Sequence, residues 1–397
     1  MPLRLLLILG ALSAFGPLAV DFYLPSFPAL AEAFGTDAER VQLSLAAYFV
    51  GLALGQLLYG PLADRFGRRI PLLAGVALFC LASLACAVAP SLEWLIAARF
   101  VQALGGCAGM VVSRAVVRDL CDPIHSAKVF SQLMLVMGVA PIMAPGLGGL
   151  LLSTLGWPSI FICLTLFSLG CWLAIARWLP ESMPKDMAKV PLNQAWVNYR
   201  GLFRDGAFMG YALTSGFAMA GMFSYIAGSP FIFIQLYGVA PEHYGLLFGS
   251  NALGFILVAQ INARLVARFG PDKLLNRVVW LYLSFGVILL LVALARFPVL
   301  WPFLLPLFCC IACLGVLLPN ASACAMAGQG QHAGSASALL GSVQFAIAAS
   351  MASLVGLLHD GTARPVALLI CLCGVLTVSC NYFTRWAEAR QRQAAAA

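Results

Sequence analysis

Charge is scarce in this chain of 397 residues. Asp, Glu, Lys and Arg together make up 10% of it, whereas hydrophobic residues make up 62%. A soluble chain of this length would fold as two or three domains with charged surfaces, and this composition excludes that class. Apolar runs of about 20 residues recur along the whole sequence, and each is long enough to cross a bilayer as a helix. The composition therefore indicates a polytopic membrane protein.

Catalytic, metal-binding and signalling features are missing as well. The 4 histidines fall in predicted loops or at the ends of predicted spans, so none resembles a proton relay. Most of the 13 cysteines lie inside apolar runs, where a thiol acts as a small hydrophobe, so we expect neither a disulfide framework nor a metal site. An enzyme would need a nucleophile with a base, a metal centre or a cofactor, and a receptor would need a signalling domain. The longest polar stretch, 180–206, is too short for such a domain.

The apolar runs predict twelve transmembrane helices. Their expected bounds are 4–30, 41–61, 71–90, 92–114, 128–152, 158–179, 207–236, 243–264, 274–295, 299–320, 335–358 and 365–384. The opening segment also resembles a signal peptide, because one arginine precedes an apolar core. We favour an uncleaved first span, since its removal would leave an odd number of spans.

The distribution of Lys and Arg predicts the orientation. With a cytoplasmic N-terminus, 19 of the 23 basic residues fall on the inner side, three (Arg40, Arg296, Arg364) fall outside, and Arg99 lies within a span. This is the positive-inside pattern, and it places both termini in the cytoplasm. The net charge of +8 is thus a topology signal. Because the charges are scattered among short loops, nucleic acid is not an expected partner.

The chain contains an internal repeat. A shift of 203 residues without gaps aligns ten identical positions between 35 and 275, and "RFG" occurs at Arg65–Gly67 and again at Arg268–Gly270. An offset of about half the chain predicts two six-span halves related as parallel repeats. We therefore expect an N-terminal bundle over 1–180, a cytoplasmic linker over 181–206, and a C-terminal bundle with a short basic tail over 207–397.

Four motifs stand at defined places in this pattern. "GPLADRFGRR" (Gly60–Arg69) lies between the second and third spans, and "DFYLP" (Asp21–Pro25) lies in the first. "RFVQALGG" (Arg99–Gly106) lies in the fourth span and is followed by "SRAVVRD" (Ser113–Asp119). "GVAPIMAPGLGG" (Gly138–Gly149) lies in the fifth, where proline interrupts the helical ladder and glycines permit flat packing against a neighbour.

With these motifs the chain resembles the major facilitator superfamily, and within it the drug:proton antiporters of the Bcr/CflA type, over essentially its whole length. The resemblance implies an all-α membrane protein with twelve transmembrane helices in two pseudo-symmetric six-helix bundles. It implies proton-coupled efflux of small hydrophobic or neutral drugs, such as chloramphenicol, florfenicol, bicyclomycin or sulfonamides, by alternating access across a bacterial inner membrane. The expected partners are the drug, protons and the lipid bilayer, and the expected state is a monomer without cofactor or metal. A symporter that imports a metabolite or nutrient is the alternative, against which the fifth-span motif argues.

In this family the loop after the second span latches the two halves together on the cytoplasmic side. Asp64 is expected to accept from backbone N–H groups or to pair with Arg65 or Arg68; the competing interpretation is a solvated basic loop. Departures from the family pattern are Ala144 in the fifth-span motif and, in the second copy of the loop, Ala267 and Pro271, so a latch there should be weaker. The residues predicted to gate the conformational change are Gly60, Asp64, Arg65, Gly67, Arg68, Arg69, Arg114, Arg118, Asp119, Gly138, Pro141, Pro145, Gly146, Gly148 and Gly149.

Asp21 and Arg99 are the only acidic or basic residues predicted to lie well inside the bilayer. Asp21 precedes the outer end of its span by nine residues and Arg99 follows the outer start of its span by seven, so both lie roughly 10–14 Å from the external boundary. Opposite charges at similar depth can pair directly or through water, which would make both tolerable. We predict that Asp21 is the proton-coupling carboxylate and that Arg99 tunes it; the competing interpretation is a static buried ion pair.

Polar and aromatic residues in the middle of other spans are candidates for the substrate site. Each can face the substrate or bond to a neighbouring helix, and the sequence leaves both options open. These residues are Tyr23, Tyr48, Gln102, Tyr225, Asn251 and Gln344.

Overall fold

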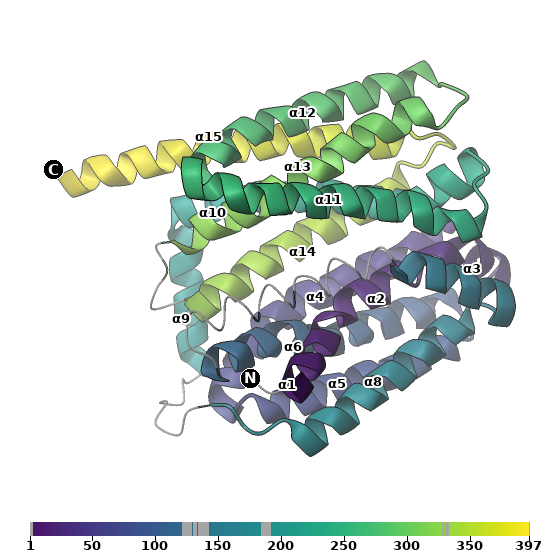
Figure 1. The fold of residues 1–397 in the computed structure, drawn as a ribbon, viewed down its shortest axis with the longest axis horizontal. Coiled ribbons are helices and arrows are strands. Elements are labelled where there is room, and N and C mark those ends of the chain that lie inside the picture. Colours follow the sequence, from purple (N-terminus) through teal and green to yellow (C-terminus); the bar gives the residue numbers. More distant parts are fainter. Residues whose placement is uncertain are drawn as a thin grey trace. The chain divides into compact units, whose positions relative to one another are not determined.

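The computed structural model describes residues 3–120, 129, 133, 143–183, 192–327, 329 and 333–396, and these are almost entirely helical (Figure 1). The main elements of the first half are α1 (Leu3–Ser13), α2 (Phe15–Asp21), η1 (Leu24–Ser26), α3 (Phe27–Ala33), α4 (Ala38–Phe66), α5 (Arg69–Ala87), α6 (Leu92–Leu120) and α8 (Pro158–Trp178). Those that follow are α9 (Leu192–Arg204), α10 (Gly206–Pro230), η2 (Phe231–Leu236), α11 (Pro241–Phe269), α12 (Pro271–Ala295), α13 (Trp301–Met326), α14 (Ala333–Leu357) and α15 (Arg364–Ala396).

The predicted all-α membrane fold is confirmed. Within the described residues, 10 helices are long and apolar enough to cross a membrane, or 11 when α1 to α3 are counted as one bent span. The predicted fifth span, 128–152, is largely outside the described residues; a shorter apolar helix covers Met143–Leu155. Helix α4 begins three residues before its predicted start and ends five after its predicted end, because amphipathic turns extend the apolar core at both ends.

The first span is broken, although its apolar sequence predicted one run over 4–30. Proline has no N–H, so it cannot donate to the carbonyl four residues before it in a helix. Pro17 withdraws this bond from Ser13, the last residue of α1, and Pro25 withdraws it from Asp21, the last residue of α2. The span bends by 40° between the segments Leu3–Ser13 and Phe15–Ala33. The sequence "DFYLP" therefore places the buried acid at a helix end.

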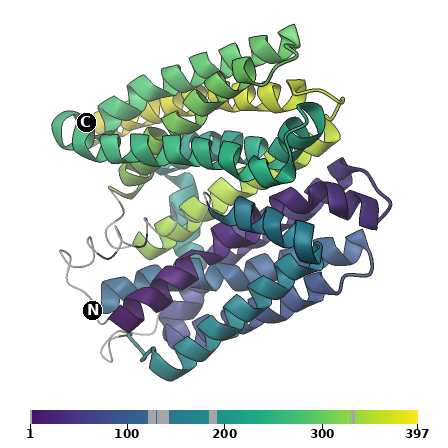
Figure 2. The same cartoon turned by 45° about the vertical axis from the view of Figure 1, so that its right-hand side comes forward.

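Packing divides the chain into two compact units, Met1–Trp196 with Pro241–Leu246, and Val197–Ala240 with Leu247–Ala397. In the first unit α6 packs against both α4 and α5, and α5 packs against α8. In the second, α10 packs against α13, α14 and α15, and α12 packs against α13 and α15. Within each unit the long helices run side by side (Figure 2). The bounds 1–180, 181–206 and 207–397 stay predictions.

Two glycines from the motifs allow helices of the first unit to approach closely. A Cβ at Gly105 of α6 would lie 2.4 Å from the backbone nitrogen of Phe79 on α5. A Cβ at Gly148 would lie 2.3 Å from the carbonyl oxygen of Phe22, the residue after Asp21. Neither position has room for a side chain. The fifth-span motif thus packs directly against the break in the first span.

Candidate substrate and proton site

The guanidinium of Arg99 lies at the centre of a buried cluster in the first unit. The side chain projects from α6 and is 0% exposed. Its carbon atom Cζ lies 4.2 Å from the ring centroid of Tyr48, 4.7 Å from that of Tyr23 and 6.0 Å from that of Phe161. Three aromatic faces within about 6 Å stabilise a cation in an otherwise apolar setting.

A hydrogen-bond chain orients this guanidinium. Arg99 Nη1 donates to Gln102 Oε1 at 2.5 Å, Gln102 Nε2 donates to Ser83 Oγ at 2.7 Å, and Ser83 Oγ donates to the carbonyl of Phe79. The residues Arg99 and Gln102 are three apart on α6, which places both side chains on one face of that helix. Gln102, which was predicted as a possible cavity-lining residue, therefore also orients the guanidinium of Arg99.

Three donors in this cluster have no acceptor within the described residues. They are Nε and Nη2 of Arg99 and the hydroxyl of Tyr48. The Tyr23 hydroxyl, in contrast, lies 2.6 Å from Ser44 Oγ, which itself donates to the carbonyl of Val41. A buried donor without a partner costs about 1–3 kcal/mol, so the cluster is suited to receive an acceptor group.

Asp21 makes no direct ion pair with Arg99. Across the described residues the ion pairs within 4.0 Å are Arg40–Glu93, Arg68–Asp64 and Arg68–Asp119. The direct form of the expected pairing is therefore absent, because the guanidinium is held by Gln102 and the aromatic rings instead. Asp21 is 4% exposed and interacts electrostatically with Tyr48, as Arg99 does.

The candidate residues of the second unit fall into two places. Asn251 Nδ2 donates to Tyr225 Oη at 3.1 Å and to the carbonyl of Leu247, and the Tyr225 ring stacks on Phe248. Asn251 Oδ1 is buried without a partner in this part of the chain. Gln344 does not join them; its Nε2 donates to Ser215 Oγ at 3.1 Å, which links α14 to α10.

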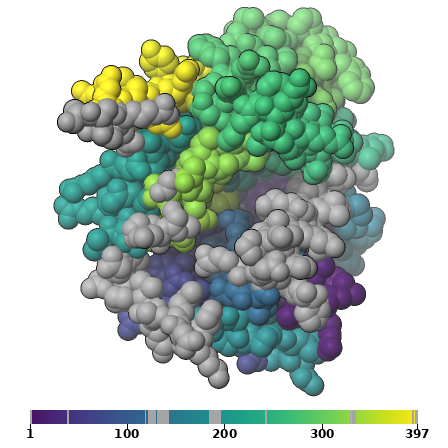
Figure 3. All heavy atoms as spheres, turned by 60° about the vertical axis from the view of Figure 1, so that its left-hand side comes forward, coloured from purple at the N-terminus to yellow at the C-terminus, as the bar shows by residue number. Residues whose placement is uncertain are grey.

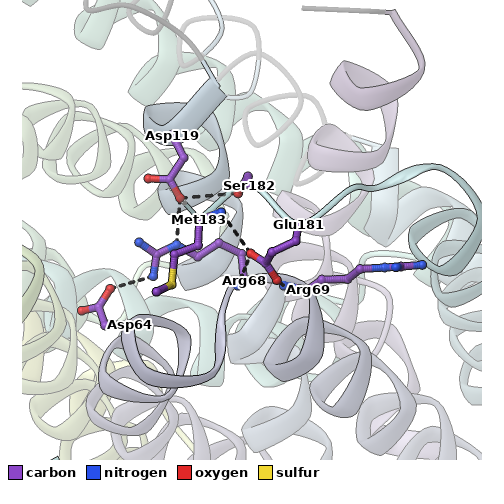
Figure 4. Close-up of polar contacts among 7 residues, drawn as sticks. All are labelled: Asp64, Arg68, Arg69, Asp119, Glu181, Ser182 and Met183. Atoms are coloured by element: carbon purple, nitrogen blue, oxygen red, sulfur yellow. Dashed lines mark hydrogen bonds and ion pairs between the residues drawn. The ribbon is translucent and has the colours of Figure 1, made fainter. Parts of the chain in front are cut away.

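A second polar cluster surrounds the turn between α4 and α5 (Figure 4). The Arg68 side chain lies between two carboxylates: Nη1 is 2.7 Å from Asp64 Oδ1 and Nε is 2.8 Å from Asp119 Oδ2. Burial lowers the pKa of Arg68, but the hydrogen bonds and charges of Asp119 and Asp64 outweigh it, so this pKa is raised. Of the two expected partners of Asp64, the structure selects Arg68; Arg65 instead stacks over Phe66 at 5.4 Å.

Glu181 also belongs to this cluster, although nothing in its sequence context except its place after the sixth span singles it out. Its Oε1 accepts from the backbone nitrogens of Arg68 and Met183, and its Oε2 accepts from that of Arg69. The N–H groups of Arg68 and Arg69 are orphans at the start of α5, and that of Met183 is local to Glu181. Burial raises the pKa of Glu181, but hydrogen bonds from the backbone of Arg68, Met183, Arg69 and Ser182 outweigh it and leave the pKa lowered.

The other predicted gating residues lie apart from this cluster or outside the described part. Arg114 is exposed on α6, and Gly60 lies on α4. Pro145, Gly146, Gly148 and Gly149 lie on the helix Met143–Leu155. Gly138, Pro141 and the side chain of Arg118 lie outside the described residues. Sequence reasoning also missed Ser44, which is four residues before Tyr48 on one face of α4, and Ser83, a lone hydroxyl in its span.

Helices that cross a membrane in two packed units, with polar clusters buried within the bundles, define a polytopic membrane transporter. Comparison with known families agrees. The profile of the Major Facilitator Superfamily matches residues 7–353, and the chain belongs to this superfamily. It is thus a multi-pass membrane transporter and not an enzyme.

Several relatives cover nearly the whole chain. It is 39% identical over 378 residues to the "Uncharacterized MFS-type transporter YdgK" of Bacillus subtilis, covering 94% of this chain and 93% of that one. It is 33% identical over 380 residues to the "Bicyclomycin resistance protein homolog" of Haemophilus influenzae (95% of each chain). It is 30% identical over 381 residues to "Multidrug resistance protein D" of Escherichia coli (95% and 94%).

Solved structures share the fold at low identity. A partially occluded inward-open conformation of the xylose transporter XylE from Escherichia coli superposes with a TM-score of 0.73 at 13% identity, covering 94% of this chain and 95% of that one. This likeness concerns the fold alone.

Proposed function

We propose that this transporter exports small neutral drugs across a bacterial inner membrane in exchange for protons, with Asp21 as the group that carries the proton. The observation that supports this most is the solitary carboxylate: Asp21 is buried in a span without a hydrogen bond or ion pair among the described residues. An ionised carboxylate in such a place is costly, and a proton removes that cost. The names of relatives that cover 95% of the chain, among them a bicyclomycin resistance protein homolog and a multidrug resistance protein, support a drug as the cargo.

Arg99 supplies the link between cargo and proton in this proposal. Its Nε and Nη2 and the Tyr48 hydroxyl are donors without acceptors. A carbonyl, nitro or sulfonyl oxygen of a drug fits them, and so does the ionised Asp21 carboxylate. If drug and carboxylate compete for these donors, a bound drug favours a protonated Asp21, and an ionised Asp21 disfavours drug binding. Exchange requires a coupling of this kind between drug and proton. The rings of Tyr23, Tyr48 and Tyr225, with Gln102, Asn251 and Gln344, are proposed to contact the drug.

The polar cluster at Arg68 is proposed to hold the cytoplasmic side closed in one conformation, as the resemblance implies. The glycine-rich motif on the fifth span would then act as the moving face. Both termini are proposed to be cytoplasmic and the transporter to act as a monomer, which agrees with the distribution of basic residues and with the single-chain family.

The test uses purified protein in liposomes with an imposed pH gradient. We expect chloramphenicol, florfenicol or bicyclomycin to cross the liposome membrane in the direction opposite to the protons. We expect Asp21→Asn to abolish this exchange while the drug still binds. Asp37→Asn, an exposed acid at the start of α4, is the matched control and should behave as the parent protein. Wild-type exchange by Asp21→Asn would overturn the role of Asp21, and drug movement in the direction of the proton would instead support a symporter. Exchange of a neutral drug for one proton moves charge, so a membrane potential should add ~2.3 kcal/mol per 100 mV to the driving force.

A further inference from the structure

Helix α9 carries an exposed face of aromatic and basic residues. Tyr199 and Leu202 are buried against the protein, whereas Trp196 is 74% and Phe203 56% exposed. Arg200 and Arg204 are exposed as well. Spacings of four and seven residues place Trp196, Arg200 and Phe203 along one side of the helix. Aromatic rings beside arginines on one face are typical of a helix that lies in the membrane interface.

The position of α9 at a bilayer boundary follows from the chain itself. Asp205 alone separates Arg204 from Gly206, where the apolar span of α10 begins. Its carboxylate caps α10 by accepting from the backbone nitrogens of Ala207 and Phe208. One residue reaches less than 4 Å, so the end of α9 lies at the level where α10 enters the bilayer. Figure 1 shows α9 running across the direction of α10 and α15, which keeps its whole length near that level.

The end of α15 extends this face. A Cβ at Gly206 would lie 3.3 Å from the Cβ of Ala387, and Tyr211 Oη donates to Glu388 Oε1 at 2.8 Å. Trp386 is 50% exposed, and the Arg390 guanidinium stacks over its ring at 4.5 Å. Figure 3 faces this end of the molecule, with the yellow atoms of α15 above the teal atoms of the segment near residue 200.

The net charge of this face is positive, because four exposed arginines stand beside two carboxylates, Asp205 and Glu388, which are engaged by neutral donors. Asp205 accepts from α10 and, through Oδ2, from Gln329 Nε2, and Glu388 accepts from Tyr211. No ion pair within 4.0 Å is found for the exposed arginines across the described residues. These arginines are Arg200, Arg204, Arg385 and Arg390.

We propose that α9 and the end of α15 form a docking surface for anionic phospholipids of the adjoining leaflet. The arginines would bind headgroup phosphates, and the aromatic rings would lie at the level of the glycerol backbones. The occupant is the bilayer because Asp205 alone joins α9 to a membrane span and the exposed face of α9 combines positive charge with apolar rings. This surface is independent of the drug and of the proton-carrying residue.

The experiment uses the full chain extracted from membranes that contain phosphatidylglycerol and phosphatidylethanolamine. Native mass spectrometry then counts the lipids of each class that stay bound. We expect R200Q with R204Q to lower the retained phosphatidylglycerol relative to phosphatidylethanolamine about fivefold or more, and R200K with R204K to preserve it. The matched control is R40Q with R296Q, two exposed arginines at the opposite ends of their spans, which should leave the ratio unchanged.

A second measurement covers the case in which the Gln variant folds poorly. Hydrogen exchange of the parent chain in nanodiscs should be slower over 192–204 with phosphatidylglycerol than with phosphatidylethanolamine alone. An unchanged lipid ratio in the Gln variant, an equal loss in the control, or identical exchange in the two nanodiscs would each overturn the proposal. A soluble protein bound at this face would give those same outcomes, since it has no reason to depend on the lipid headgroup.

Discussion

The turns that follow α4 and α11 are two copies of one backbone with different side chains around them. Both helices have 29 residues, and both end in Arg-Phe-Gly with a glycine in the left-handed region, Gly67 at φ 85° and Gly270 at φ 77°. Arg65 stacks over Phe66 and Arg268 over Phe269, each at 5.4 Å. The repeat detected in the sequence is thus a repeat of local conformation.

The two turns share a backbone conformation but differ in the charged side chains around them. The first turn has an arginine between two carboxylates, and Glu181 accepts its free N–H groups. In the second turn Pro271 stands where Arg68 stands in the first, so the N–H that Glu181 accepts there does not exist. Near the second turn Asn276 instead donates through Nδ2 to Asp272 Oδ1 and accepts through Oδ1 from Asn381 Nδ2. The comparison shows that the turn itself needs only the Arg-Phe-Gly sequence, and that the polar cluster is an addition to the first copy.

The largest expected effect comes from Arg68→Ala. It leaves Asp119, which is 4% exposed, with only a 3.4 Å contact to Ser182, so we expect a loss of about 3 kcal/mol in the free energy of unfolding. Pro271→Ala at the matched position should cost less than about 1 kcal/mol. Unfolding of the two variants in detergent, followed by circular dichroism, measures both. Equal losses would mean that the cluster adds no stability to the first turn.

The two glycines provide a sharper comparison. Alanine at either position would have to adopt a positive φ with an extended ψ (173° at Gly67 and 156° at Gly270), at a cost of about 1–3 kcal/mol. At Gly67 the new Cβ would also lie 2.5 Å from Glu181 Oε2, whereas at Gly270 nothing lies within 4 Å. We expect Gly67→Ala to lower the unfolding temperature more than Gly270→Ala does. Because the carboxylate is the end of a flexible side chain, the excess should disappear when Glu181→Ala is added. If Gly67→Ala still lowered the unfolding temperature more than Gly270→Ala when Glu181→Ala was present, the difference would come from the backbone and not from the Glu181 contact.

The smallest expected effect is the pH dependence of Glu181. Its folded pKa is below the ordinary value, so its hydrogen bonds contribute fully above about pH 4.5 and are lost as the pH falls through the folded pKa. Since the side chain is exposed, the contribution should be about 1 kcal/mol or less. The stability difference between the parent protein and Glu181→Gln should therefore shrink from pH 6 to pH 3. A difference that is constant over this range would contradict the role of its charge.

Much of the fold could be predicted because membrane spans obey a simple rule of length and hydropathy. The described spans from α4 onward, the fifth excepted, begin within three residues of their expected starts, and the repeat offset of 203 residues coincides with the offset between α4 and α11. The break of the first span was not predicted, although it follows from the spacing of Pro17 and Pro25. Hydropathy does not register a missing N–H.

The candidate sites were likewise predicted in part and missed in part. The sequence left backbone N–H groups, Arg65 and Arg68 open as partners of Asp64, and the structure pairs Asp64 with Arg68, one helical turn away. A pairing of Asp21 with Arg99, either direct or through water, was expected from their similar depth alone, and depth does not determine direction around a helix axis. Aromatic rings and Gln102 compete for the same guanidinium, and only side-chain coordinates reveal the outcome. Glu181 could not be assigned because its function is to satisfy backbone groups, which leave no signature in composition.

The prolines of the first span have a further consequence. A continuous helix resists bending because each change of tilt strains its ladder of backbone bonds, but here the rungs at Ser13 and Asp21 are already missing. The segment at the acid therefore has fewer backbone bonds to resist bending than an unbroken helix has; those that remain there include Phe22 N to Leu18 O and Tyr23 N to Val20 O. Replacing Pro25 by alanine would supply an N–H that can donate to the carbonyl of Asp21. This should stiffen the first span at Asp21 while leaving every charged atom in the protein unchanged.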